Sequence, residues 1–344
     1  METKTAVVLI VLPVVLLFVI PVLHFLAFGV LIFFIVNVAM AMTHDGDLLL
    51  MLYEKWGQDG SDLRGKVAWV TGASSGIGKA LSCELAHKGV KLILSARREK
   101  ELELVKEQCL RYSGMDYKDI LVLPMDVADY ESHKRCAEKA LDHFKKVDIL
   151  VNNAGRSQRS LAAETNLEVD RAIMDLNFIG QVSVTKAILP HMIARQEGHI
   201  VNISSVSGRV PTELSSSYVA SKHALLGYFD VFAYENEAIH VTNVCPGPVE
   251  SDIVRNAFGN NLNSPKFQEV GAGERGALLC MTAERCASLI VVAVANKLSE
   301  VWICKNIVMI LMLMHHWAPL LTVWIKKRVY GNKRIKDFKK SQGY

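Results

Sequence analysis

The sequence lacks the patterns typical of metal-binding, disulfide-bonded and fibrous proteins. Its seven cysteines form an odd set without a Cys-x-x-Cys pair, so we expect no metal site and no disulfide framework in a chain of this length. No repeat or low-complexity tract occurs, and 22 glycines and 9 prolines among 344 residues exclude a collagen-like chain or a solenoid. With 51% hydrophobic and 22% charged residues, the chain is not globally disordered and suits one or two folded domains.

Basic residues are in excess only at the C-terminal end. Residues 326–344 hold eight basic residues and one acid, a charge of +7, which leaves −3 of the net +4 for the rest of the chain. An acidic body disfavours nucleic acid as a partner. The basic tail suits anionic lipid headgroups, with a solvated tail as the alternative.

Charge is absent from residues 6–42, an apolar run interrupted by one histidine, one asparagine and two prolines. As a helix these 37 residues would extend about 55 Å, well beyond the ~30 Å hydrocarbon core of a bilayer. The run predicts either one long helix kinked at a proline or a short segment followed by a span over residues 22–42. A cleaved signal peptide would need a basic start and a shorter apolar core. We therefore expect residues 1–44 to be a retained membrane anchor, whose orientation the sparse lysines leave open.

After this leader, residues 45–64 are predicted to be a linker with one short amphipathic helix, Leu48–Trp56. Strand-like apolar runs then alternate with helix-like segments, which predicts βαβ units. We expect an α/β fold, a doubly wound parallel sheet forming a single domain over residues 65–300. The six predicted strands are residues 66–71, 91–95, 120–124, 147–152, 199–204 and 241–245.

A glycine-rich turn, Thr71-Gly-Ala-Ser-Ser-Gly-Ile-Gly78, follows the first predicted strand. Its glycines permit close approach of the backbone to a pyrophosphate, whose charge the next helix N-terminus meets. Such a turn can also serve local geometry alone. The strand before it and the helix after it favour dinucleotide binding.

Two Tyr-x-x-x-Lys pairs occur, a spacing that puts an ammonium beside a phenol on one helix face. Tyr218 and Lys222 follow a predicted strand that leads into Ser205, thirteen residues before the tyrosine. Tyr130 and Lys134 have no such serine, and we predict that they lie on a solvated helix face. Tyr218 is therefore the candidate acid/base residue.

In their order and spacing these motifs resemble those of short-chain dehydrogenases/reductases over residues 65–301. The resemblance includes Asn152-Asn-Ala-Gly155 after the fourth predicted strand, Asn177, and the turn Pro246-Gly247. It implies a Rossmann fold and an oxidoreductase. Within the family, the resemblance is to a branch that is anchored through its N-terminus. It is carried by four segments, one of which is Leu94-Ser-Ala-Arg-Arg98.

The resemblance also implies roles. Tyr218 would exchange a proton with the substrate oxygen, and Ser205 would bind that oxygen as the substrate-binding residue. Lys222 would bind the nicotinamide ribose and favour the phenolate, and Asn177 would hold a relay water. The implied cofactor-binding residues are Thr71, Gly72, Ser74, Ser75, Gly76, Ile77, Gly78, Arg97, Arg98, Asp126, Val127, Asn153, Ala154, Gly155, Tyr218, Lys222, Pro246, Gly247 and Val249.

The end of the second predicted strand bears on the cofactor. NAD enzymes place an acid there for the ribose hydroxyls, and this position holds Ala96, followed by Arg97 and Arg98. An arginine can pair with a 2′-phosphate, so NADP(H) is favoured over NAD(H). A second basic residue typical of NADP enzymes is absent, because Ser75 occupies its position.

Residues 301–325 are apolar but contain Lys305, a histidine pair and Pro319, which favours an interfacial segment over a second span. The sequon at Asn202 lies on a predicted buried strand, so we expect no glycosylation there. Residues 249–276, which would cover the substrate, contain no motif that identifies the substrate.

The resemblance implies an endoplasmic-reticulum membrane enzyme for a carbonyl or secondary alcohol of a small apolar substrate, such as a steroid, a retinoid or a xenobiotic ketone or aldehyde. A catalytically weak scaffold or an NADP-sensing regulator is the alternative. The oligomeric state is left open, with a homodimer among the alternatives.

Overall fold

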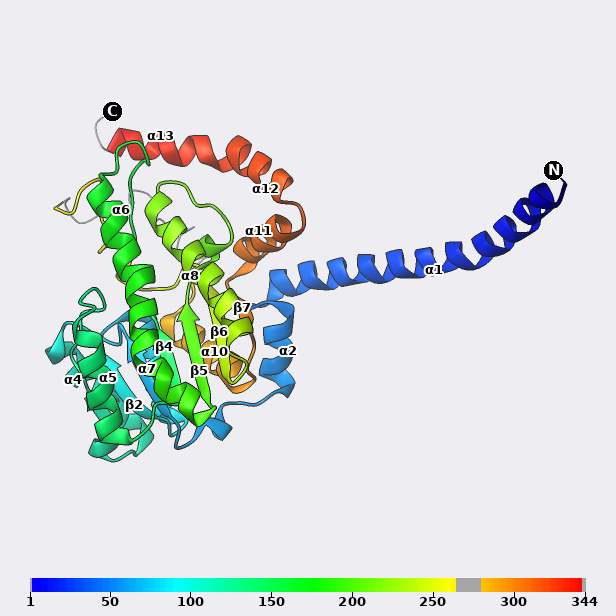
Figure 1. The fold of residues 1–344 in the computed structure, drawn as a ribbon. Helices are drawn as coiled ribbons and strands as arrows, with labels where there is room; N and C mark the ends of the chain where they lie inside the picture. Colours follow the sequence, from blue (N-terminus) through cyan, green and yellow to red (C-terminus); the bar gives the residue numbers. More distant parts are fainter. Residues whose placement is uncertain (1, 264–279, 342–344) are drawn as a thin grey trace.

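The computed structural model describes residues 2–263 and 280–341, which contain a seven-stranded parallel sheet with helices on both faces (Figure 1). The strand order β3-β2-β1-β4-β5-β6-β7 means that the chain starts inside the sheet, winds to one edge and returns to build the other. The predicted doubly wound α/β fold is confirmed. The strands are β1 (Val67–Thr71), β2 (Lys91–Ser95), β3 (Ile120–Val122), β4 (Ile149–Asn152), β5 (Gly198–Ile203), β6 (Ile239–Pro246) and β7 (Glu300–Ile303).

Two helical layers bury the two faces of the sheet. Along β1, Ala68 and Val70 belong to one hydrophobic cluster and Val67 and Trp69 to the other, because successive side chains of a strand point to opposite faces. Burial on both faces explains why the strands are continuous apolar runs. The first cluster includes α3 (Gly76–His87), α4 (Glu99–Ser113) and α10 (Ala283–Ala295), and the second α5 (Ser132–Phe144), α7 (Gly180–Arg195) and α8 (Ser216–Glu235).

The segment predicted to be a linker is bonded to the domain. The carboxylate of Asp47, at the start of α2 (Leu48–Trp56), accepts hydrogen bonds from the Leu50 N–H (3.0 Å) and from the Trp302 N–H of β7 (2.7 Å). Arg285 of α10 forms ion pairs with Asp45 and Glu54. The short amphipathic helix has the predicted bounds, Leu48–Trp56, and its apolar face packs on α10.

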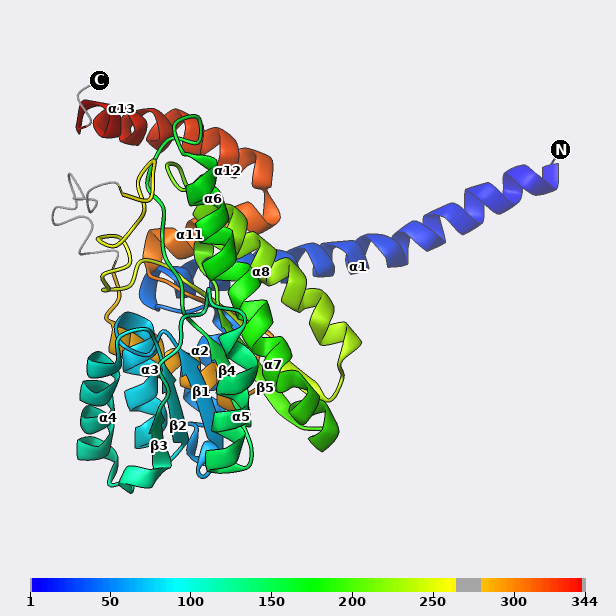
Figure 2. The ribbon, with the colours of Figure 1, turned by 60° about the vertical axis from the view of Figure 1, so that its left-hand side comes forward.

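A seventh strand was not predicted. β7 pairs with β6 from Glu300 opposite Asn243 to Ile303 opposite Pro246, so the sheet extends past the expected domain end at residue 300. A strand of four residues that leads into an apolar region gives little periodic signal. It is followed by α11 (Asn306–Trp317), α12 (Pro319–Ile325), η5 (Lys326–Gly331) and α13 (Asn332–Ser341), which lie beyond the carboxyl ends of the strands (Figures 1 and 2).

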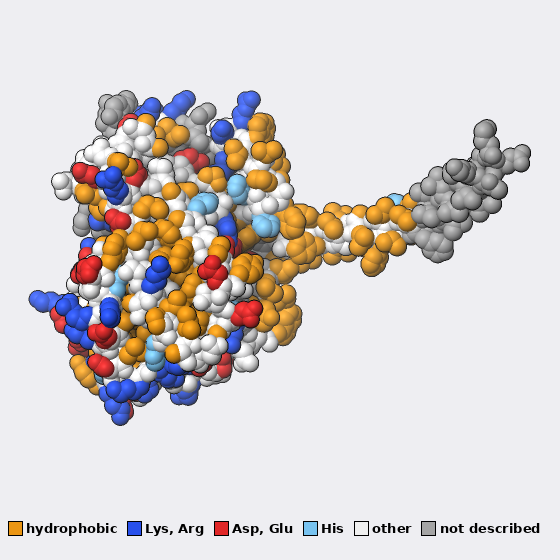
Figure 3. All heavy atoms as spheres, viewed as in Figure 1, with side chains coloured by type: hydrophobic (Ala, Val, Ile, Leu, Met, Phe, Trp, Pro, Cys, Tyr) orange, Lys and Arg blue, Asp and Glu red, His pale blue; other side chains and the backbone are white. Residues whose placement is uncertain are grey.

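The leader forms one continuous helix, α1 (Glu2–Thr43), that projects from the domain (Figure 2). This is the single-helix arrangement of the two that the sequence allowed. Within the described part of the chain, Val19–Met40 is the one helical stretch long and apolar enough to cross a membrane, and none of it is buried. Figure 3 shows hydrophobic side chains along the described length of this projecting helix.

Candidate active site at the carboxyl end of the sheet

The residues singled out by the sequence gather where four neighbouring strands end. β1 ends at Thr71, β4 at Asn152, β5 at Ile203 and β6 at Pro246. These strands are adjacent, and the chain winds in opposite directions from β1 and from β4. Folds of this kind bind ligands in the crevice at such a switch point, outside the carboxyl ends of the strands.

Two glycines of the glycine-rich turn have no room for a side chain. Gly72 has φ +65°, and a Cβ there would lie 2.8 Å from the Ala154 Cα. A Cβ on Gly78 would overlap the Gly72 carbonyl oxygen. Gly76 has φ +54° and opens α3, whose first N–H groups have no acceptor within the helix and suit a pyrophosphate.

Hydrogen bonds join this turn to the loop after β4. The Thr71 hydroxyl donates to the Val151 carbonyl (3.0 Å) and accepts from the N–H groups of Asn153 (3.0 Å) and Ala154 (3.1 Å). The Asn153 side chain donates to the Thr71 carbonyl (2.9 Å). These hydrogen bonds therefore fix the turn and the Asn-Ala-Gly segment relative to each other. Ile77, at the end of the turn, packs against the first hydrophobic cluster.

Two arginines lie beside the turn. Arg98 donates to the Ser74 hydroxyl (3.2 Å), and the Arg97 guanidinium lies 3.9 Å from the Asp126 carboxylate. The Arg97 side chain is 68% exposed, whereas Val127 is buried. Two guanidinium groups and a hydroxyl at an open position suit a phosphate monoester.

The Ser205 hydroxyl lies near the Tyr218 phenol. The Ser205 Oγ donates to the Pro246 carbonyl (3.4 Å) and accepts from the Ser207 N–H (3.1 Å). Burial raises the pKa of Tyr218, while the nearby Ser205 hydroxyl and the charge of Arg159 lower it. At neutral pH the phenol is protonated and can donate a proton.

Lys222 lies one helical turn from Tyr218 on α8. Its ammonium donates to the Ile203 carbonyl (2.8 Å) and is 5.9 Å from the centroid of the Tyr218 ring. The side chain is almost fully buried, and burial lowers the pKa of Lys222 to about 8. A buried cation with one neutral acceptor has room for a further electron-rich partner, such as a ribose hydroxyl.

Asn177 lies in a π-helical turn, Asp175–Ile179, between α6 (Leu167–Met174) and α7. Its side chain accepts from the Arg156 N–H (2.8 Å) and donates to the Arg156 carbonyl (2.9 Å) and to the Ser221 hydroxyl (3.0 Å). Ser221 donates in turn to the Tyr218 carbonyl (2.8 Å). Asn177 therefore connects the loop after β4 to the first turn of α8. Single π-helical turns occur often at functional sites.

The end of β6 closes the other side of the crevice. The Gly247 N–H donates to the Ile303 carbonyl (2.8 Å), and a Cβ on Gly247 would lie 2.6 Å from the Cys304 Cβ. Val249 forms an isolated β-bridge with Met281. Of the segment predicted to cover the substrate, residues 264–276 lie outside the described residues.

Sequence reasoning missed Arg159, the cation whose charge lowers the pKa of Tyr218. Its guanidinium donates to the hydroxyls of Ser157 (2.9 Å) and Ser215, the residue before α8. Its neighbour Arg156 stacks on Phe258, 3.8 Å from the ring centroid. Arg156 directly follows the Asn-Ala-Gly motif and Arg159 lies three residues further on, and this proximity to the motif was the signal in the sequence.

Two other sequence motifs, the Tyr130–Lys134 pair and the sequon at Asn202, are not part of this group of residues. Tyr130 is in the turn before α5 and not on a helix face, and burial together with a hydrogen bond to Asp175 raises its pKa to about 12. Lys134 is exposed. Asn202 is fully buried in β5.

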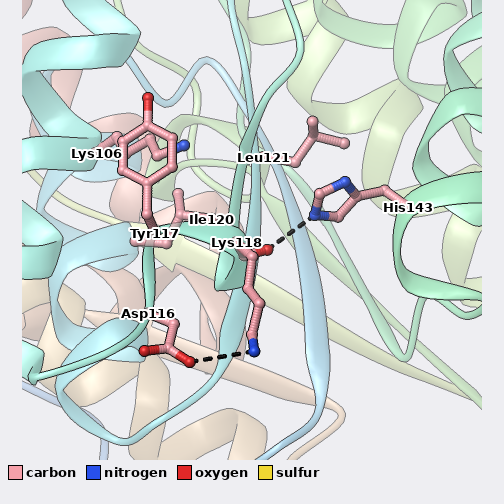
Figure 4. A pocket seen from close by; sticks show the side chains of 7 residues that line it. All are labelled: Lys106, Asp116, Tyr117, Lys118, Ile120, Leu121 and His143. Atoms are coloured by element: carbon pink, nitrogen blue, oxygen red, sulfur yellow. Dashed lines mark hydrogen bonds and ion pairs between the residues drawn. The ribbon is translucent and has the colours of Figure 1, made fainter.

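A hollow of about 650 Å³ lies at the start of β3 (Figure 4). Its lining includes Tyr117, whose ring centroid is 3.3 Å from the Lys106 ammonium, and His143, which bonds the Lys118 carbonyl (2.8 Å). The hollow faces the amino ends of the strands, and none of the predicted site residues lines it.

Comparisons with known proteins match most of the chain. A family model described as short chain dehydrogenase matches residues 66–261. A mouse protein named dehydrogenase/reductase SDR family member 7 is 43% identical over 321 residues, which cover 92% of this chain and 93% of the mouse protein.

Two solved structures are similar in fold. One is an alcohol dehydrogenase from the archaeon Thermococcus sibiricus complexed with 5-hydroxy-NADP, with a TM-score of 0.60, 24% identity, and coverage of 71% of this chain and 98% of that chain. The other is a short chain dehydrogenase/reductase from Burkholderia phymatum in complex with NAD, with a TM-score of 0.65, 24% identity, and coverage of 75% and 95%. The two contain different dinucleotides, so they do not distinguish NADP from NAD for this chain.

Proposed function

This chain belongs to the short-chain dehydrogenase/reductase family of oxidoreductases, and we propose that it is a membrane-anchored enzyme that transfers a hydride between NADP(H) and a carbonyl or secondary alcohol of an apolar substrate. The observation that carries the proposal is the position of Tyr218 next to the buried Lys222 on α8, with the Lys222 ammonium 5.9 Å from the tyrosine ring and the Ser205 hydroxyl nearby. These residues lie at the same end of the sheet as the glycine-rich turn.

Tyr218 is the proposed acid and base. In reduction its phenol gives a proton to the substrate oxygen, and in oxidation the phenolate accepts it. Ser205 donates a hydrogen bond to the same oxygen and keeps it within reach. Because burial raises the pKa of Tyr218, the phenolate needs nearby positive charge, which Arg159 and protonated Lys222 supply.

The residues present fit a nicotinamide dinucleotide, which when bound supplies or accepts the hydride. A Cβ at Gly72 or Gly78 would collide with the loop after β4 or with the turn itself, so these glycines let the turn and α3 pack closely. The N-terminus of α3 would then meet the pyrophosphate. Arg97 and Arg98, with the Ser74 hydroxyl, would hold the 2′-phosphate that distinguishes NADP from NAD. Lys222 would hold the nicotinamide ribose, and Asn177 would orient the loop after β4 and a relay water.

The membrane proposal rests on α1 and on the segment after β7. Phe33 and Phe34, inside the candidate span, contact Trp317 at ring-centroid distances of 6.3 and 5.5 Å. Leu320 is 86% and Trp324 58% exposed, and basic residues follow them. Exposed aromatic and aliphatic side chains next to lysines are typical of a membrane interface. An apolar substrate could then reach the crevice from the bilayer, which we propose is that of the endoplasmic reticulum on the family resemblance.

The activity is tested with a panel of steroid, retinoid and simple aromatic carbonyl compounds added to purified membranes. Oxidation of NADPH and NADH is followed beside membranes containing the Tyr218→Phe variant. We expect NADPH-dependent reduction of at least one carbonyl that this variant lacks. A panel without such a difference would contradict the enzyme and favour the NADP-sensing regulator.

The anchor is tested by carbonate extraction at high pH, which strips peripheral proteins. The full chain should stay in the pellet, and a variant lacking residues 1–44 should be released or bind only weakly and in a salt-sensitive way through the basic tail. Full retention of the shortened chain would move the anchor to residues 306–325.

A further inference from the structure

The turn that follows Ser205 lies directly on α8, the helix that carries Tyr218 and Lys222. This turn is the short 3-10 helix η4 (Val206–Gly208), which Ser205 precedes and Arg209 follows. A Cβ on Gly208 would lie 2.9 Å from the Leu226 Cδ1 and 3.1 Å from the Lys222 carbonyl oxygen. The turn and the helix are therefore in close backbone contact.

Arg209 holds the far end of this turn between two carboxylates. Its guanidinium pairs with Asp230 of α8 (3.2 Å), and it bonds Glu300 of β7 through Nε (3.1 Å) and through a second, shorter contact. Asp230 also accepts from the Asn243 side chain of β6 (2.8 Å). One guanidinium thus joins the turn to α8, β6 and β7.

A row of asparagines extends this anchor across the sheet. The Asn202 side chain donates to Asn243 (2.9 Å), and the Asn152 side chain donates to Asn202 (2.9 Å). The three residues are in register on β4, β5 and β6 and are almost fully buried. Buried amides bonded to each other set the strand register firmly, because a slip would leave them without partners.

The two ends of the turn meet α8 at different heights. Tyr218, Lys222, Leu226 and Asp230 follow each other at four-residue intervals, a spacing that keeps side chains on one broad face of a helix. Ser205 lies near the first of these residues, and Arg209 pairs with the last. At its own end the Ser205 hydroxyl has the long bond to Pro246 and the bond from Ser207, and its carbonyl accepts from the Gly208 N–H (2.8 Å). The Ser204 hydroxyl donates to the Lys222 carbonyl of α8 (3.2 Å).

We propose that Arg209 is a positioning residue, whose contacts with Asp230 and Glu300 hold Ser205 against Tyr218. The inference rests on the proposed function, because it assigns the origin of the Ser205–Tyr218 geometry. A displacement of a reacting group by about 1 Å can cost ~100-fold in rate. Loss of one remote anchor should shift Ser205 by less, and we expect a decrease in kcat of about tenfold.

The chain offers a matched control at the opposite end of the sheet. Arg195 also lies between two carboxylates, 2.6 Å from Asp148 and 3.2 Å from Glu197. Arg195→Met removes the same chemistry as Arg209→Met, far from the crevice. Both variants should lose stability, but only Arg209→Met should lower kcat, with KM for the carbonyl and the Kd of NADPH unchanged. Arg209→Lys, which keeps the charge and one contact, should restore part of kcat.

A double-mutant cycle tests whether Arg209 acts through Asp230. If both act on one geometry, adding Asp230→Asn to Arg209→Met should lower kcat little further. Independent, multiplying losses would overturn the inference, as would equal kcat values for Arg209→Met and Arg195→Met. If Tyr218→Phe keeps full turnover, the proposed function fails instead.

Tyrosinate absorbance gives a readout that needs no substrate. The pKa of Tyr218 is obtained by difference from the Tyr218→Phe background. It should rise in Arg209→Met, because the nearby Ser205 hydroxyl lowers it, and should not change in Arg195→Met. The charged or titratable neighbours of this phenol among the described residues are Arg159, Lys222 and Cys245, and neither substitution replaces any of them. Burial raises the pKa of the Cys245 thiol and Arg209 lowers it, so the loss of Arg209 keeps that thiol neutral. An unchanged pKa in Arg209→Met would overturn the inference.

Discussion

The two ends of the parallel sheet favour opposite protonation states of their buried ionisable groups: the charged form at the amino end and the neutral form at the carboxyl end. At the amino end, burial by itself would raise the pKa of Asp148, but Lys146 (2.8 Å), Arg195 (2.6 Å) and the Val67 N–H (2.8 Å) bond its carboxylate and lower the pKa below the usual range. Here the charged form is satisfied by the protein. Its bonds join the starts of β1 and β4 to the end of α7, so they serve the fold.

At the carboxyl end the neutral forms are favoured. Burial raises the pKa of Tyr218 and lowers that of Lys222 to about 8. Neither group has an oppositely charged partner bonded to it among the described residues. Buried ionisable groups without a charged partner lower the stability of the fold. They are typical of sites where a bound ligand supplies the missing interactions. Variants at the carboxyl end should therefore change catalysis more than stability, and variants at the amino end the reverse.

The largest effect is expected for Tyr218→Phe, which removes the transferable proton and keeps the ring. Turnover should fall at least ~100-fold, while binding of NADPH, followed by its fluorescence, and the melting temperature should change little. Tyr130→Phe is the matched control and should leave turnover nearly unchanged. A purified Tyr218→Phe protein with near-normal turnover would remove this tyrosine from the mechanism.

Asp148→Asn should lower the free energy of unfolding by about 2 kcal/mol at neutral pH, because two ionic hydrogen bonds are lost and their cations are partly exposed. The lowered pKa means that Asp148 contributes stability above its unfolded pKa of about 3.9 and loses it as the pH falls through the folded pKa. The gap between wild type and variant, measured by urea unfolding, should narrow below about pH 4. If Asp148→Asn also lowered turnover per folded molecule, the amino end of the sheet would affect catalysis and the proposed contrast with the carboxyl end would be wrong.

Arg97→Asp places a carboxylate where a 2′-phosphate would bind and should weaken NADPH binding about tenfold more than NADH binding. Because the Arg97 side chain is largely exposed, the melting temperature should stay near that of the wild type. Titrations of both dinucleotides give the comparison. Equal losses for the two would show that Arg97 does not contact the phosphate.

Lys222→Met should change stability less than Asp148→Asn and in the opposite direction, with a gain of about 1 kcal/mol together with loss of turnover. The charged ammonium is disfavoured by burial, and its removal outweighs the loss of one hydrogen bond to the Ile203 carbonyl. The pKa of Lys222 is lower in the folded than in the unfolded state, so the gain should be full below about pH 8 and shrink toward pH ~10.5. A variant less stable than wild type at neutral pH would indicate that Lys222 supports the fold.

Much of the sheet and of the candidate site could be predicted because their signals are local. Buried parallel strands are continuous apolar runs, and the turn that contains Gly72 and Gly78 needs glycine for reasons of space. The thirteen-residue spacing from Ser205 to Tyr218 is a property of one short segment. The family comparison agrees with the motifs from which the family was recognised.

β7 and the packing of α2 could not be predicted in the same way. β7 has four residues with alternating burial and leads into the apolar helix α11, so its pattern does not separate the strand from that helix. The amphipathic pattern of α2 predicts a helix but not the surface that covers it. That surface is provided by α10 and β7, more than 230 residues away, through Arg285 and Trp302.

By itself the sequence determined the type of fold, the glycine-rich turn, the tyrosine–lysine pair and the apolar leader, because each depends on neighbours within a few turns of chain. Only the tertiary structure decided which charges are satisfied. Arg159 reaches Ser215, and Arg209 reaches Asp230 and Glu300, and no spacing rule links such distant positions. The energy of a buried charge depends on the partners that the folded chain brings within hydrogen-bonding distance. It also depends on how far the fold excludes water from that charge.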